Sequence, residues 1–235
     1  MKKIGLIGGM SWESSIEYYR IINQGVREAL GGVHSAESVM VSVDFGEIEK
    51  LQAAGKWEEA TRIMVQCARE VEGAGADFLL ICTNTMHLMA EEVQAAIQIP
   101  LLHIADATAR AVQSAGLQSL GLLGTRFTME KDFYRGRLEK IHGLRVIIPA
   151  EDRRAFVHRV IYEELVQGKI IKESREGYLR VIDSLVERGA EGIILGCTEI
   201  GLLIKKDDLP LPSFDTMEIH ARSAVDAALG RYDLD

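Results

Sequence analysis

The sequence contains no apolar run that approaches the roughly 18 to 20 residues needed to cross a bilayer. Its first apolar stretch, Ile4 to Met10, is short and interrupted by glycine, and it is followed by Ser-Trp-Glu. We interpret this stretch as a buried strand and not as the core of a signal peptide. The chain therefore gives no indication of a membrane partner.

Cysteine is also scarce, with Cys67, Cys82 and Cys197 as the three examples. Their spacing fits neither a metal site nor a disulfide framework. The six histidines are likewise scattered without metal-ligand spacing, so we expect no metal ion. An odd number of cysteines without an export signal predicts a cytoplasmic protein.

Basic residues are in the minority, since 27 Lys and Arg face 35 Asp and Glu and the formal net charge is −8. The pairs Arg153-Arg154 and Lys205-Lys206 are isolated, and we interpret both as solvated surface. No basic stripe is interleaved with aromatic residues, which argues against a nucleic-acid partner. An acidic small molecule is still allowed as a substrate, because a pocket acts through local donors and not through global charge.

Short apolar runs alternate with longer stretches of helical period, which is typical of α/β proteins whose parallel sheets are covered on both faces. The predicted strands are Lys3–Gly8, Ser38–Asp44, Phe78–Cys82, Leu101–Ile104, Leu120–Leu123, Arg145–Ile148, Gly192–Gly196 and Ser213–Phe214. The predicted helices are Ser14–Leu30, Trp57–Gly73, Met86–Ala96, Asp106–Ala115, Met129–Ile141, Asp152–Leu165, Glu173–Arg188 and Glu218–Leu229.

The chain also repeats itself. Two segments recur in similar form later in the chain at nearly the same spacing. Ile-Gly-Leu-Ile-Gly-Gly at 4–9 is similar to residues 120–125, and Gly-Ala-Asp-Phe-Leu-Leu-Ile at 75–81 is similar to residues 189–195. We therefore predict two similar Rossmann-like lobes, the first formed by residues 1–98 and 211–235 and the second by residues 99–210. Ligands of open α/β sheets bind beyond the carboxyl ends of the strands, so we expect the site in a cleft between the lobes.

The loop after the first predicted strand, Gly8-Gly9-Met10-Ser11-Trp12-Glu13-Ser14, contains glycines that allow a tight turn and is followed by a helix. Ser14 and Glu17 fit a capping box, and free N–H groups at a helix start attract anions such as a carboxylate. A nucleotide-binding module built on this turn is an alternative, but neither the G-x-G-x-x-G fingerprint nor a P-loop is present. The echo at 124–128 adds a hydroxyl at Thr125.

Reactive side chains follow the second pair of repeated strands. One end reads Cys82-Thr83-Asn84-Thr85-Met86-His87, and the other reads Gly196-Cys197-Thr198-Glu199. Two alignments of these segments are possible. If Gly-Ala-Asp is aligned with Gly-Ala-Glu, Thr83 corresponds to Cys197. If the two Cys-Thr pairs are aligned instead, Cys82 corresponds to Cys197. Neighbouring strand residues point to opposite faces, so the two registers exclude each other, and these residues alone leave both open.

At these positions the chain resembles the aspartate/glutamate racemase family over essentially its full length. The matching words are Gly-Gly-Met-Ser-Trp-Glu-Ser, Asn84-Thr85 within Cys-Thr-Asn-Thr-Met-His, Leu-Gly-Thr at 123–125 and Gly-Cys-Thr-Glu at 196–199. The first word is most similar to the L-aspartate/glutamate-specific and broad-specificity racemases. The resemblance implies two α/β domains related by a pseudo-twofold axis, usually in a homodimer, and no cofactor.

The resemblance also implies a pair of catalytic cysteines, one taking the α-proton of an amino acid and the other donating a proton to the opposite face. Cys197 matches one of them, whereas Thr83 occupies the position of the other. This departure favours the register in which Thr83 faces the cleft. A threonine hydroxyl is a very poor base near neutral pH, so we expect slow or one-handed turnover.

Substrate contacts are implied by motif position. Met10 and Ser11 would hold a carboxylate through backbone N–H groups, and Gln52, expected in a loop, would contact the side-chain carboxylate. Hydroxyl and amide groups would bind carboxylates and the ammonium group: Asn84, Thr85, Thr125 and Thr198. Glu199 would orient the site or balance the ammonium charge, with capping of the following turn as the alternative. For His87 we expect a role in helix packing.

Three other interpretations stay open at this point. The chain could catalyse a related reaction with the same cysteine chemistry, as a hydantoin racemase, a maleate isomerase or a malonate decarboxylase relative. It could also bind amino acids without converting them, because Thr83 replaces a cysteine. It could, finally, be the nucleotide-binding or sensor module considered above.

Overall fold

The computed structural model describes residues 1–234, and the chain separates into two compact units. The first unit comprises Met1–Ile104 and the segment that begins at His220, and the second comprises Ala105–Ile219. The chain therefore crosses between the units twice, after Ile104 and after Ile219. Within residues 1–234, no helix is long and apolar enough to cross a membrane.

The first unit contains a parallel sheet in the order β2-β1-β3. Its central strand β1 and its neighbour β3 are buried along their whole length, whereas β2 is half-exposed at the edge. The elements of this unit are β1 (Ile4–Gly8), α1 (Trp12–Leu30), β2 (Ser38–Ser42), α2 (Phe45–Ala53), α3 (Trp57–Gly73), β3 (Phe78–Ile81), the 3₁₀ helix η1 (Thr85–Met89) and α4 (Ala90–Ala95).

The second unit contains a parallel sheet in the order β5-β4-β6-β7. Strands β4 and β6 are fully buried, as expected where helices cover both faces of a parallel sheet. The elements are α5 (Ile104–Ser114), β4 (Ser119–Gly124), α6 (Arg126–Glu130), α7 (Arg135–Lys140), β5 (Arg145–Ile147), α8 (Glu151–Glu163), η2 (Leu165–Gln167), α9 (Lys172–Glu187), β6 (Gly192–Gly196), α10 (Ile200–Leu203), η3 (Lys206–Asp208) and β7 (Ser213–Asp215). The last helix, α11 (Thr216–Ala228), begins in the second unit and continues into the first from His220.

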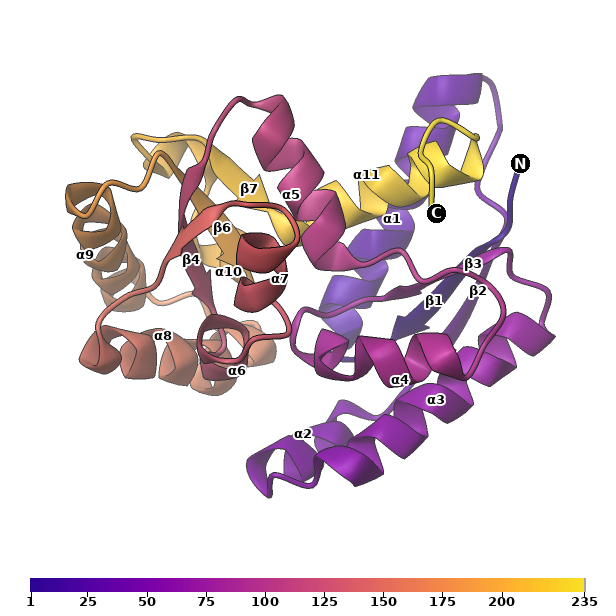
Figure 1. Cartoon of the computed structure of the whole chain (residues 1–235), viewed down its shortest axis with the longest axis horizontal. Helices are drawn as coiled ribbons and strands as arrows, with labels where there is room; N and C mark the ends of the chain where they lie inside the picture. Colours follow the sequence, from indigo (N-terminus) through magenta and orange to yellow (C-terminus); the bar gives the residue numbers. More distant parts are fainter. Residues whose placement is uncertain (235) are drawn as a thin grey trace. The chain divides into compact units, whose positions relative to one another are not determined.

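Helices cover the sheets because each presents an apolar stripe at helical spacing. Helix α3, for example, buries Ala60, Met64, Cys67 and Val71 against the first sheet. Figure 1 shows α3 and α4 on one side of β1 to β3 and α1 on the other. In the second unit α8 and α9 pack against each other and against β4. The prediction of an α/β fold with two parallel sheets flanked by helices is confirmed.

The strand registers show the internal repeat directly. Ile4 pairs with Phe78 in the first sheet, and their sequence echoes Leu120 and Gly192 pair in the second. The echoed words therefore occupy equivalent places in the two sheets. The equivalence extends to the fourth strand, since β7 lies beside β6 where the first sheet has only a single parallel bridge between Leu79 and Leu101.

Several predictions of local structure are wrong. The strand at 213–215 does not return to the first lobe, because it pairs with β6, and the chain re-enters the first unit only at His220. The strand predicted at 101–104 is reduced to the bridge at Leu101, since α5 already begins at Ile104. Gln52 lies in helix α2 and not in a loop, and helix α1 begins at Trp12 with Ser11, not Ser14, as its N-cap.

Candidate active site

The loop after β1 is shaped by glycine and serine. Gly9 has φ 90°, and a Cβ at this position would lie 2.2 Å from the carbonyl oxygen of Val43, so only glycine fits the turn. Ser15 Oγ accepts from the Gly9 amide at 2.8 Å and donates to the Ser11 carbonyl at 2.9 Å. Ser11 Oγ in turn accepts from the Ser14 amide at 3.3 Å. These bonds hold Met10 and Ser11, both buried, at the carboxyl end of the central strand.

Cys82 and Thr83 follow β3 and have different surroundings. The Cys82 amide donates to the carbonyl of Ile7 at 2.9 Å, and the side chain of Cys82 is completely buried. This burial raises the pKa of the Cys82 thiol strongly. Thr83, in contrast, is only half-buried. Thr83 is therefore the residue at this strand end whose side chain a small molecule can reach.

The turn that follows Thr83 is held by side chains from its own unit. His87 Nδ1 lies 2.8 Å from the carbonyl oxygen of Thr83, and Gln52 Nε2 donates to Met86 Sδ at 3.1 Å. Asn84 and Thr85, next to Thr83, are both buried. The first unit thus brings together all the site residues predicted for it, at the carboxyl ends of β1 and β3 and in α2.

In the second unit the ends of β4 and β6 approach each other closely. Gly124 pairs with Gly196, and a Cβ on Gly196 would lie 2.8 Å from the carbonyl oxygen of Leu123. This approach needs glycine in both strands, and it brings Thr125 and Cys197, the residues that follow them, to one edge of the sheet. Thr125 Oγ1 accepts from the Thr128 amide at 3.2 Å and caps α6.

Cys197 forms a compact polar group with its two successors. Its Sγ donates to Glu199 Oε2 at 3.0 Å, and Thr198 Oγ1 donates to the same oxygen at 2.8 Å. All three residues are buried. The alternative role for Glu199 is wrong, since its side chain forms no cap on α10 and instead accepts both bonds.

The surroundings of Cys197 favour the protonated thiol. Burial raises the pKa of Cys197 well above its ordinary value, and the charge and hydrogen bond of Glu199 raise it further, whereas backbone hydrogen bonds lower it. The resting thiol is thus a proton donor that already points at a carboxylate. A carboxylate at hydrogen-bond distance can also take the thiol proton when a thiolate is needed.

Thr83 and Cys197 occupy equivalent positions of the repeat. Ile81 in β3 pairs with Ile7, and Leu195 in β6 pairs with Leu123, the sequence echo of Ile7. Thr83 comes two residues after Ile81, and Cys197 comes two residues after Leu195. Cys82 corresponds to Gly196 in this register. The structural register therefore agrees with the pairing counted from Gly-Ala-Asp and Gly-Ala-Glu.

Sequence reasoning missed two contacts of this site. His87 was assigned to helix packing, but it bonds the backbone of Thr83, and Glu199 bonds the Cys197 thiol directly. The short spacing of each pair is visible in the sequence, although the direction of the side chains is not. Within residues 1–234, no group of three His, Cys, Asp or Glu side chains is arranged to hold a metal ion.

Comparison with known proteins gives the family. The model of the Asp/Glu/Hydantoin racemase family matches residues 7–224. The chain belongs to this family. The family and the relatives indicate that it is an isomerase, an amino-acid racemase. The resemblance inferred from the four sequence motifs is confirmed.

Three relatives illustrate the range of similarity. The broad-specificity amino-acid racemase RacX of Bacillus subtilis (strain 168) is 24% identical over 179 residues, which cover 73% of this chain and 74% of the relative. A crystal structure of a candidate Asp/Glu racemase from Yersinia pestis is 54% identical, with a TM-score of 0.91 over 97% of this chain and 100% of that chain. An aspartate racemase homologue from Pyrococcus horikoshii OT3 is 36% identical, with a TM-score of 0.84 over the same shares of the two chains.

Proposed function

We propose that this racemase acts on aspartate and glutamate without a cofactor, with Cys197 serving one face of the substrate α-carbon and Thr83 the other. The observation that carries the proposal is the equivalence of these two positions in the repeated sheets, together with the contact of the Cys197 thiol with Glu199. Racemisation needs a base on one face and a proton donor on the opposite face, and two equivalent strand ends can supply them.

The contacts of Cys197 indicate where each proton goes. To act as a base, the thiol first passes its proton to the Glu199 carboxylate, 3.0 Å away. The resulting thiolate takes the α-proton of the substrate and leaves a planar carbanion. The opposite face then receives a proton from the Thr83 hydroxyl or from a water molecule that it holds. In the reverse direction the Cys197 thiol is the donor, and Thr83 is a very poor base.

This difference makes α-proton exchange unequal at the two faces of the α-carbon. The enantiomer whose α-hydrogen faces Cys197 should lose it quickly, and the enantiomer whose α-hydrogen faces Thr83 should lose it slowly. General acid–base catalysis by a positioned side chain typically contributes about 10²- to 10⁴-fold. We therefore expect the rates of α-proton exchange of the two enantiomers to differ by at least about 100-fold.

We assign the substrate contacts to the polar residues around the two strand ends. The backbone of Met10 and Ser11 would bind one carboxylate, and Gln52 would contact the second. The ammonium and carboxylate groups would meet Asn84, Thr85, Thr125 and Thr198, and Glu199 would balance the ammonium charge until it takes the thiol proton. Because Gln52 is neutral, we expect weaker selection for dicarboxylic amino acids than an arginine would give.

The test is α-proton exchange in deuterated water, followed by NMR, with L- and D-aspartate, L- and D-glutamate and neutral amino acids. One enantiomer should exchange much faster than the other. Thr83→Cys should accelerate the slow enantiomer, and Cys197→Ala should abolish exchange of the fast one. Equal exchange of both enantiomers by the wild type would contradict the one-sided mechanism. Binding without exchange of either enantiomer would show an amino-acid-binding protein.

We also propose a homodimer and a cytoplasmic location. The first rests on the family and is measured by sedimentation. The second rests on the three free thiols of Cys67, Cys82 and Cys197 and on the chemistry assigned to Cys197, which requires a reduced sulfur. A stable monomer that retains full activity would contradict the first, and an oxidised Cys197 in protein taken from cells would contradict the second.

A further inference from the structure

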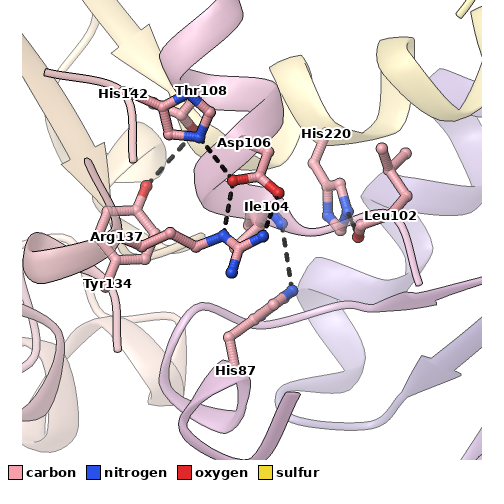
Figure 2. Close-up of polar contacts among 9 residues, drawn as sticks. All are labelled: His87, Leu102, Ile104, Asp106, Thr108, Tyr134, Arg137, His142 and His220. Atoms are coloured by element: carbon pink, nitrogen blue, oxygen red, sulfur yellow. Dashed lines mark hydrogen bonds and ion pairs between the residues drawn. The ribbon is translucent and has the colours of Figure 1, made fainter. Parts of the chain in front are cut away.

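His87 connects the backbone of Thr83 to the segment where the chain leaves the first unit. Its Nδ1 lies 2.8 Å from the Thr83 carbonyl oxygen, and its Nε2 accepts from the Ile104 amide at 3.2 Å. Ile104 is the last residue of the first unit before the chain crosses to the second. Figure 2 shows the His87 ring pointing at this amide.

The two partners determine the protonation of the ring. A backbone N–H can only donate, so Nε2 must carry a lone pair, and a backbone carbonyl can only accept, so Nδ1 must carry the proton. His87 is therefore a neutral imidazole that uses both nitrogens, one on Thr83 and one on Ile104. The side chain is almost fully buried, so neither bond is replaced by water without cost.

The second crossing of the chain meets the same cluster. His220, the first residue after the return to the first unit, lies with Nε2 2.8 Å from the Leu102 carbonyl oxygen and with Nδ1 2.9 Å from the Tyr18 hydroxyl. Its ring centroid is 5.9 Å from that of His87, and the ring of His103 is 4.5 Å from that of His87. The first crossover segment is thus bonded to two neighbouring buried imidazoles, at Ile104 by His87 and at Leu102 by His220, and the second crossover supplies one of them (Figure 2).

We propose that His87 is a positioning residue with two separate roles: its bond to the Thr83 carbonyl holds the strand end on which the proton transfer assigned to Thr83 depends, and its bond from the Ile104 amide holds the crossover. The inference rests on the proposed function for its catalytic part. A misplacement of about 1 Å can lower the rate of a reaction on the order of 10²-fold. Loss of the bond to Thr83 should therefore lower turnover and leave substrate binding largely unchanged.

Two substitutions separate the two bonds of His87. The amide nitrogen of asparagine is attached to Cγ, as Nδ1 of histidine is, so His87→Asn can still donate to Thr83 and loses the acceptor for Ile104. The amide oxygen of glutamine is one bond further out, as Nε2 is, so His87→Gln can still accept from Ile104 and loses the donor to Thr83. Each variant is the matched control of the other.

The catalytic test uses the Thr83→Cys background, where exchange of the slow enantiomer should be fast enough to measure. Adding His87→Asn should keep this gain, and adding His87→Gln should reduce the exchange rate by about 10- to 100-fold at an unchanged KM. Equal gains in the two double variants would overturn the inference. If Thr83→Cys alone gives no gain, the proposed function fails instead.

The crossover part is tested independently of any activity. Hydrogen exchange of the Ile104 amide, followed by NMR in the single variants His87→Asn and His87→Gln, should be faster in the first, where the acceptor is lost, and protected in the second. Similar protection of Ile104 in both variants would refute the link between His87 and the crossover, even if both variants fold as the wild type does.

Discussion

Asp106, at the start of α5, is the centre of a partly buried charge cluster in the second unit. Arg137 donates to its two oxygens at 2.6 and 2.7 Å, and His142 Nε2 lies 2.7 Å from Oδ1 (Figure 2). Burial raises the pKa of Asp106, but the hydrogen bonds and charges of Arg137 and His142 outweigh it, so the pKa lies below its ordinary value. The cluster therefore stabilises the charged form.

The magnitude for Asp106→Asn follows from these contacts. Hydrogen bonds to charged groups contribute roughly 1.5–3 kcal/mol, and an acidic residue in the first helical turn adds about 0.3–1 kcal/mol. Since asparagine keeps one acceptor, we expect a loss of about 2–3 kcal/mol in the free energy of unfolding. For a chain of this size the melting temperature should fall by roughly 4–12 °C.

Asp132 provides a matched control in the same unit. It pairs with Lys140 at 2.7 Å, nearly the same distance as in the Asp106 pair, but its side chain is 82% exposed, against 24% for Asp106. Surface ion pairs contribute little, because water screens them and two long side chains must be ordered. Asp132→Asn should leave the melting temperature unchanged. Equal losses for both variants would refute the reasoning from burial.

The pH dependence gives a second check. A carboxyl group with a lowered pKa stabilises the folded state above its unfolded pKa, about 3.9, and this stabilisation is lost as the pH falls through the lower folded value. The gap between the wild type and Asp106→Asn in urea unfolding should be full at pH 7 and should shrink below about pH 4. A gap that is constant between pH 7 and pH 3 would contradict the assigned charge effect.

Three further variants test the site itself. Glu199→Gln removes a charge that raises the pKa of Cys197, so alkylation of this thiol by iodoacetamide should reach its fast rate at a lower pH; an unshifted pH profile would argue against the contact. Cys82→Ala should keep α-proton exchange, since this thiol is completely buried, and exchange reduced as far as in Cys197→Ala would reverse the assignment. Gly196→Ala should lower the free energy of unfolding by about 1–3 kcal/mol, because the added Cβ overpacks the two strands. The control in urea unfolding is Gly73→Ala, where a Cβ meets nothing within 4 Å. Equal stability of the two variants would refute the close approach of the strands.

The sequence was sufficient for the long buried elements. Strands β1, β4 and β6 are continuous apolar runs, and α3 begins and ends where its apolar period predicts. Helix α2 was missed because it has nine residues, contains Gly46, and buries only Ile48 and Gln52, so its apolar period is weak. The strand at Leu101 follows Pro100 and stops at one bridge, which an apolar pattern alone does not reveal.

The site was predicted through residue types and not through geometry. Polar side chains after apolar runs indicated where the buried strands end. Which of Cys82 and Thr83 corresponds to Cys197 depends on the pairing of β3 with the neighbouring strand β1. Strand pairing is a tertiary property, so these residues alone left this choice open. The bond of His87 to Ile104 spans 17 residues and a change of element, so no local pattern indicates it. The placement of β7 failed for the same reason, since its partner β6 is defined only in space.

The repeat preserves positions in the two units while the chemistry at those positions differs. Two residues beyond Cys197 lies Glu199, whose carboxylate accepts from the thiol, and two residues beyond Thr83, at the equivalent place, lies Thr85. At these two positions the first unit therefore has neither a thiol nor a carboxylate that could take its proton, and it holds the backbone of Thr83 through His87 instead. A cysteine introduced at Thr83 would restore only one of the two missing groups. We accordingly expect Thr83→Cys to accelerate α-proton exchange of the slow enantiomer without making the exchange rates of the two enantiomers equal, because its thiolate would still form without a neighbouring carboxylate at the position of Thr85.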